Sequence, residues 1–132
     1  MEVWKEVENE IPEPTTFYCA AISNSEEKGL VIKLHDGSSN VTIDFGYVLS
    51  VNIIDEGMNQ GYLYQADLSQ FKQSRFRNVI YQVSDGVYSD FVKKIADGMW
   101  EAVDAKHYVI ITENFNIDVI TEFEPEILIE QA

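Results

Sequence analysis

The stretch "HYVIITENFNIDVIT" (residues 107–121) decides the interpretation of the fold, because it holds two short runs rich in β-branched residues. β-branched residues favour strands, and the polar residues 113–116 that separate the two runs are typical of a corner. The stretch therefore predicts two strands joined as a hairpin. The run "EPEILI" (residues 124–129) predicts an edge strand after it.

His107 opens this hairpin and is one of two histidines in the chain. A lone histidine at a strand start is usually half-buried with one ring nitrogen bonded to the backbone or a carboxylate, so we expect a structural role. Asp118 alternates with Ile117 and Val119, which favours a side chain that points to solvent. If Asp118 points inward instead, it would pair with His107 across the hairpin.

One main helix is predicted before the hairpin, at about residues 88–103. Apolar residues recur there at spacings of three and four, the period of one helix face, and we expect this stripe to face the core: Tyr88, Phe91, Val92, Ile95, Met99, Ala102 and Val103. Ser84, Asp85 or Ser89 would cap the helix start. Gly98 lowers helix stability by about 1 kcal/mol relative to alanine, so tertiary packing must compensate.

The remaining strand signals lie mostly in the first half of the chain. A strand is predicted in residues 15–23, a hairpin in residues 29–45 with its turn at residues 36–40, and another strand in residues 77–83. Gly46 is interpreted as a bulge or bend within a continuing strand. Strands around one long helix predict an α+β domain, a mostly antiparallel β-sheet packed against one main α-helix. The length of 132 residues fits a single domain over residues 1–132.

Charge narrows the class of partner. The chain has 23 acidic and 9 basic residues, for a net charge of −14, which repels nucleic-acid phosphates and anionic lipid. We therefore expect neither nucleic acid nor a membrane as a partner. Two accounts of the acidity stay open: general solubility, and an electrostatic match to a basic protein or mimicry of nucleic acid.

The expected location is the cytoplasm. The single cysteine, Cys19, lies in an apolar run and has no second cysteine with which to form an intramolecular disulfide. No signal-peptide pattern opens the sequence, and no apolar run approaches the roughly 18 residues of a membrane span.

The search for catalytic chemistry predicts that the protein is not an enzyme. Two distant histidines and one cysteine supply no metal-ligand spacing, so no metal site is expected. Ser50, Ser69 and Ser84 lie in no nucleophile motif, and "GMNQG" lacks the lysine of a phosphate-binding loop. We expect no catalytic residues and no cofactor.

Four segments carry a resemblance to a known family: "YVLSVNIIDEG", "SDGVYSDFVKKIADGMW", "KHYVIITENFNIDVIT" and "EPEI". Together they resemble the small bacterial immunity proteins of polymorphic toxin systems, over about residues 40–128. The resemblance implies a non-enzymatic protein that binds and neutralises a cognate toxin domain. It implies no particular binding residue, and the first forty residues lie outside it.

A protein partner is therefore expected, with a basic toxin domain as the leading candidate. Carboxylates would steer such a partner, and aromatic side chains would anchor it. The predicted partner-binding residues cluster around one loop region: Asp55, Glu56, Tyr62, Tyr64 and Asp67. The alternative is an acidic interaction or structural domain of other purpose, with an enzyme third. The sequence leaves the oligomeric state open.

Overall fold

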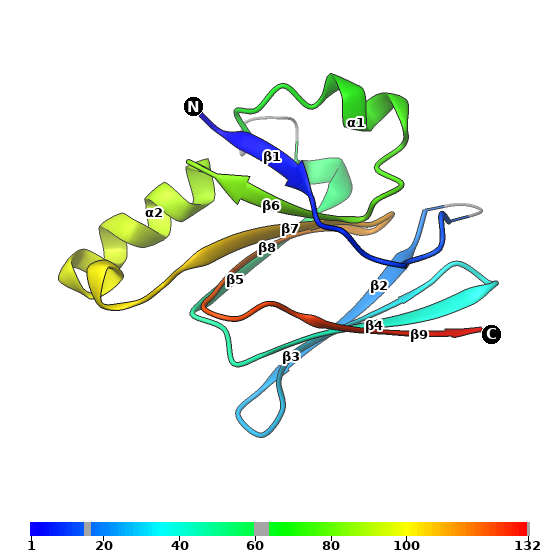
Figure 1. Cartoon of the computed structure of the whole chain (residues 1–132), viewed down its shortest axis with the longest axis horizontal. Helices are drawn as coiled ribbons and strands as arrows, with labels where there is room; N and C mark the ends of the chain where they lie inside the picture. Colours follow the sequence, from blue (N-terminus) through cyan, green and yellow to red (C-terminus); the bar gives the residue numbers. More distant parts are fainter. Residues whose placement is uncertain (15–16, 60–63, 132) are drawn as a thin grey trace.

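The strands form two antiparallel sheets in the computed structural model, which describes residues 1–14, 17–59 and 64–131 (Figure 1). Strand order is β1-β6-β7-β8-β5 in the first sheet, here sheet A, and β2-β3-β4-β9 in the second, sheet B. The strands are β1 Val3–Glu6, β2 Cys19–Ser25, β3 Gly29–His35, β4 Ser39–Gly46, β5 Ser50–Asp55, β6 Ile80–Ser84, β7 Lys106–Ile111, β8 Phe115–Thr121 and β9 Glu126–Gln131. The helices are η1 Glu56–Met58, α1 Ser69–Gln73, α2 Val87–Ala96 and η2 Asp97–Ala102, where η marks a 3-10 helix.

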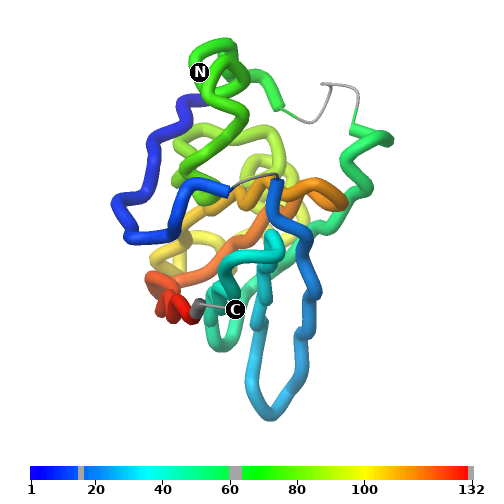
Figure 2. Tube along the Cα trace, turned by 90° about the vertical axis from the view of Figure 1, so that its right-hand side faces the viewer, coloured from blue at the N-terminus to red at the C-terminus, as the bar shows by residue number. Residues whose placement is uncertain are grey.

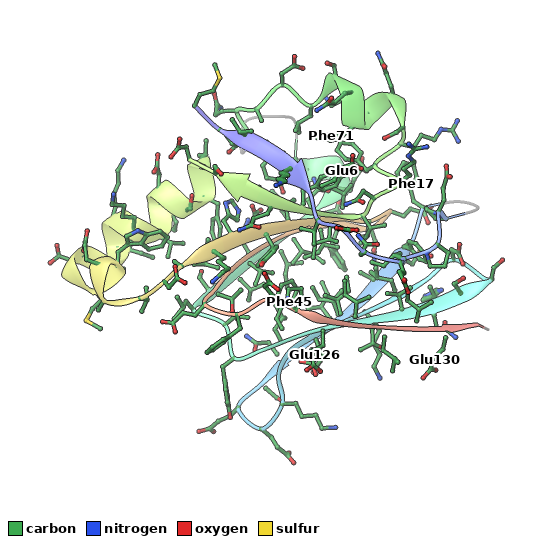
Figure 3. All side chains as sticks on the ribbon, viewed as in Figure 1. Glu6, Phe17, Phe45, Phe71, Glu126 and Glu130 are labelled. Atoms are coloured by element: carbon green, nitrogen blue, oxygen red, sulfur yellow. The ribbon has the colours of Figure 1, made fainter. Side chains whose placement is uncertain are left out.

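The main core lies between the two sheets. Leu30, Ile32 and Ile43 of sheet B pack in one cluster with Ile110 and Ile117 of sheet A, and all five are fully buried. Phe45 also lies between the sheets, whereas Glu126 and Glu130 of β9 point away from them (Figure 3). The β2–β3 hairpin projects beyond the rest of the molecule (Figure 2).

A second core covers the other face of sheet A. Tyr81 and Val109 pack there with Phe71 of α1, and half-buried Tyr64 and Phe76 close over them. Sheet A is therefore covered on both faces, by sheet B on one side and by residues 64–76 with α2 on the other.

The predicted hairpin of residues 107–121 is confirmed. β7 and β8 pair with Val109 opposite Asp118 and Ile110 opposite Ile117, and the Thr112 hydroxyl donates to the Phe115 carbonyl at the corner (2.7 Å). The predicted turn between β3 and β4 is confirmed too, since the Asp36 carboxylate accepts hydrogen bonds from the backbone N–H of Ser38 and Ser39. β9 is an edge strand, as expected.

Strands predominate more than expected, and they form two sheets instead of one. The break lies at Gly46, where the prediction of a continuing strand is wrong. Gly46 ends β4 of sheet B with a φ of 63°, and the chain then crosses to β5 of sheet A. Its left-handed backbone suits glycine. A Cβ on Gly29 at the start of β3 would lie 2.2 Å from the Gly46 backbone, so β3 and β4 approach closely at this point.

The main helix is shorter than predicted, because α2 ends at Ala96 and η2 follows. Asp97 adopts a φ of 51°, which breaks the α-helical run. The predicted caps are also wrong: Gly86 is the N-cap, and the carboxylate of Glu2 accepts the N–H of Val87 (2.9 Å).

The prediction that the whole apolar stripe faces the core is wrong for four of its members, since Ala102 is exposed as well as the three large side chains. Tyr88 and Val92 are buried against Ile120, but Phe91, Ile95 and Met99 are 56%, 67% and 67% exposed. α2 and η2 extend past the end of the sheets (Figure 1), so no described element forms a second layer over the helix there. Only a narrow line of the helix therefore contacts the sheet.

Candidate functional site

Asp55, Glu56 and Asp67 are all exposed, and two of them serve local turns. The Asp55 carboxylate accepts the N–H of Gly57 (2.8 Å) and caps η1, which Glu56 opens. The Asp67 carboxylate accepts the N–H and hydroxyl of Ser69 just before α1, and these hydrogen bonds lower the pKa of Asp67. Tyr62, the fourth predicted member of this loop, lies outside the described residues.

Tyr64 is half-buried, and it links the loop to the sheet. Its ring lies edge-on to Trp4 with centroids 4.9 Å apart, and its hydroxyl donates to Asp118 Oδ2 (3.1 Å). Burial, with the Asp118 carboxylate beside it, raises the pKa of Tyr64 far above its ordinary value. The phenol is therefore a neutral hydrogen-bond donor at physiological pH.

A cavity of about 590 Å³ brings Glu56 and Tyr64 together. Its described lining comes from η1, residues 64–76 and the corner of the β7–β8 hairpin, while Asp55 and Asp67 are not part of it. The lining residues that were not predicted to bind a partner include Phe17, Phe76, Glu113 and Asn116. Asn116 alternates with Asp118 along β8, which was the one sequence signal for it.

His107 and Asp118 pair across the hairpin, so the expectation that Asp118 points to solvent is wrong. Asp118 is fully buried because Tyr64 covers this face of sheet A, and His107 Nε2 lies 2.8 Å from Asp118 Oδ1. With the proton on Nε2, the ring and Tyr64 both donate to the same carboxylate. His107 Nδ1 has no hydrogen-bond partner among the described residues, and a Cβ on Gly86 would lie only 2.6 Å from it.

Glu2 is a second buried carboxylate, and its burial was not predicted from the sequence. It accepts hydrogen bonds from Trp4 Nε1 (3.2 Å) and from the backbone N–H of Gln65 and Ala66 (2.8 and 2.9 Å) as well as that of Val87. It thus joins β1, the loop before α1 and the start of α2. Nothing in the sequence distinguishes it from the chain's other glutamates.

The exposed residues Phe91 and Ile95 of α2 and Met99 of η2, here the α2 stripe, form the other candidate surface. The Phe91 ring stacks on Tyr88 (centroids 6.4 Å apart), whose hydroxyl contacts the Ser50 hydroxyl at the start of β5. Asp90, Lys93 and Lys94 are charged residues of the same helix. Large apolar side chains grouped on an otherwise charged surface are typical of a protein-interaction site.

The described residues contain no group of three or more His, Cys, Asp or Glu side chains placed to hold a metal ion. Within this described part of the chain, no helix has both the length and the apolar character needed to cross a membrane. No family model, curated protein or solved structure matches the chain.

Proposed function

We propose that this protein is a non-enzymatic immunity protein that binds and neutralises a cognate bacterial toxin domain. The observation that carries the proposal is the α2 stripe: Phe91, Ile95 and Met99 are each more than half exposed and recur four residues apart along one segment of the chain. Leaving such side chains in water forgoes burial that folding would otherwise gain, so a partner that covers them would gain that burial instead.

The net charge of −14 supports a basic toxin domain as that partner. An excess of 14 carboxylates attracts a basic protein over a long range and disfavours a second copy of the same chain. Apolar anchors on α2 would then hold the complex after the encounter. As part of the same proposal, the protein acts in the cytoplasm, which also suits its single free cysteine.

The test uses the toxin domain encoded next to this gene. Cells that express it should grow when they also express the wild-type protein. Phe91→Ser together with Ile95→Ser should weaken the complex by at least about tenfold, since truncated anchors typically cost more than 1 kcal/mol each. Leu128→Ser is the matched control, because Leu128 is 58% exposed on β9, in the other sheet.

We expect the wild type to rescue growth and the double variant to lose that rescue. The control variant should rescue growth as the wild type does. Failure of the wild type to bind the neighbouring domain would overturn the immunity proposal. Equal binding by the double variant and the wild type would remove the α2 stripe from the interface.

A further inference from the structure

The 590 Å³ cavity holds a polar group that folding leaves without a partner. Asn116 is only 8% exposed, and its side-chain amide makes no hydrogen bond within residues 1–14, 17–59 and 64–131. Its neighbour Asn114 shows the usual arrangement, since that amide accepts the N–H of Ala20 (2.9 Å) and donates to the Ala20 carbonyl (3.0 Å). Among the described residues, the fully buried side-chain atoms without a partner are Tyr81 Oη and His107 Nδ1, so the Asn116 amide must reach solvent, and in the cavity it is open to a ligand.

The walls around Asn116 are aromatic. Phe17, Tyr64 and Phe76 line the cavity, and the Tyr64 hydroxyl is already committed to Asp118. The Thr112 hydroxyl also has a hydrogen-bond partner, because it donates to the Phe115 carbonyl. The walls therefore offer ring surfaces beside the Asn116 amide.

The charge at the cavity is negative. Glu56 and Glu113 contribute two carboxylates, and Lys72 is the one cation among the described lining residues. Two carboxylates disfavour an anion, and the unpaired amide disfavours a purely apolar ligand. Rings, two carboxylates and an amide together favour a cation that can both stack on rings and donate several hydrogen bonds.

We infer that the cavity binds an arginine side chain carried by a loop of a partner protein. A guanidinium is planar, stacks on aromatic rings and directs up to five N–H donors in a fixed fork toward carboxylate and amide oxygens. A lysine ammonium offers no flat surface for stacking. A volume of 590 Å³ exceeds one side chain, so the residues flanking the arginine also enter.

This inference rests on the proposed function only in that the ligand belongs to a protein. It places a second contact at the corner of the β7–β8 hairpin, where the predicted residues Glu56 and Tyr64 line the cavity. The cavity would thus bind one arginine side chain of the partner, while the α2 stripe would make apolar contacts with it.

The experiment is a titration of the full-length ¹⁵N-labelled chain with three capped tripeptides, Gly-Arg-Gly, Gly-Lys-Gly and Gly-citrulline-Gly, followed by NMR. Citrulline keeps the shape of arginine and removes its charge. Gly-Arg-Gly should shift the side-chain NH₂ signals of Asn116 and the backbone signals of residues 111–116. It should bind at least about tenfold more tightly than the citrulline peptide, because charge-assisted hydrogen bonds are lost in the latter.

Two double variants separate this site from the general acidity. E56Q with E113Q should weaken Gly-Arg-Gly binding about tenfold. E126Q with E130Q removes the same charge from β9, on the other sheet, and should leave binding within about twofold of the wild type (Figure 3).

Three results would each overturn the inference. They are equal affinity for the arginine and citrulline peptides, equal weakening of binding by the two double variants, and no shift of the Asn116 NMR signals. The titration contains no toxin, so a negative result leaves the neutralisation test intact. A failure of neutralisation would likewise leave a specific arginine site standing.

Discussion

The β7–β8 hairpin and the α2–η2 segment are both rich in apolar residues, yet only the hairpin is buried on both faces. Ile110 and Ile117 of the hairpin face the core between the sheets, and Val109 faces residues 64–76. In α2, burial is limited to the line through Tyr88 and Val92. The number of layers around a segment, more than its apolar content, therefore decides how much of it leaves water.

This contrast assigns different roles to the two regions. Substitutions in the hairpin should lower the free energy of unfolding, because the side chains there pack against other elements on both faces of the sheet. Substitutions in the α2 stripe should change binding and leave folding almost unaffected. Single substitutions in each region test this division.

Asp118→Ala should have the largest effect, a loss of about 2–5 kcal/mol in the free energy of unfolding. The substitution removes the acceptor shared by His107 and Tyr64, and it leaves both donors buried. Urea unfolding followed by circular dichroism measures it. Glu130→Ala, which removes an exposed carboxylate from β9, is the control and should stay within about 0.5 kcal/mol of the wild type. Equal losses in the two variants would contradict the role given to Asp118.

His107→Ala should cost about 1–3 kcal/mol, since one buried hydrogen bond is lost and the carboxylate keeps its bond from Tyr64. The same urea experiment on His35→Ala, which alters the exposed histidine at the end of β3, should show almost no change. If both variants share the wild-type midpoint, the buried pair contributes nothing to stability.

Association with the proposed toxin domain should slow by about tenfold or more between roughly 50 and 500 mM salt, as the Debye length falls from about 14 to 4 Å. Asp55→Asn with Glu56→Gln should lower the association rate more than it raises the dissociation rate, because exposed carboxylates act mainly on the encounter. Ile95→Ser should act on the dissociation rate instead. Surface plasmon resonance separates the two rates, and an association rate independent of salt would remove electrostatic steering.

Ile95→Ser should have the smallest effect on folding, within about 0.5 kcal/mol of the wild type, because Ile95 is already two-thirds exposed. Val92 lies less than one helical turn away, on the buried side of the helix. Val92→Ala should lower the free energy of unfolding by about 1–2 kcal/mol. Thermal unfolding of the two variants compares the faces of one helix directly. A larger loss for Ile95→Ser would mean that the stripe is covered within the folded chain.

Local patterns were sufficient for the hairpins and insufficient for the candidate site. The β-branched runs of residues 107–121 and the Asp36 turn depend on neighbours in the sequence, and both are found as predicted. Asn116 and Glu2 depend on segments far along the chain: the loop of residues 64–76 covers the face of Asn116, and the N–H groups around Glu2 come from residues 65, 66 and 87. Polar residues of this kind have no local signature.

Sequence by itself determined the strand periodicity, the position of the main helix and the net charge of −14, because each depends on residue type and spacing alone. Only the tertiary structure decided that there are two sheets, that Asp118 is buried and that half of the apolar helix face stays in water. The physical reason is that periodicity reports which residues share a face, whereas burial depends on whether a distant segment packs over that face. For Asp118 that segment is the loop carrying Tyr64, and for Phe91, Ile95 and Met99 no described segment of this chain fills the same place.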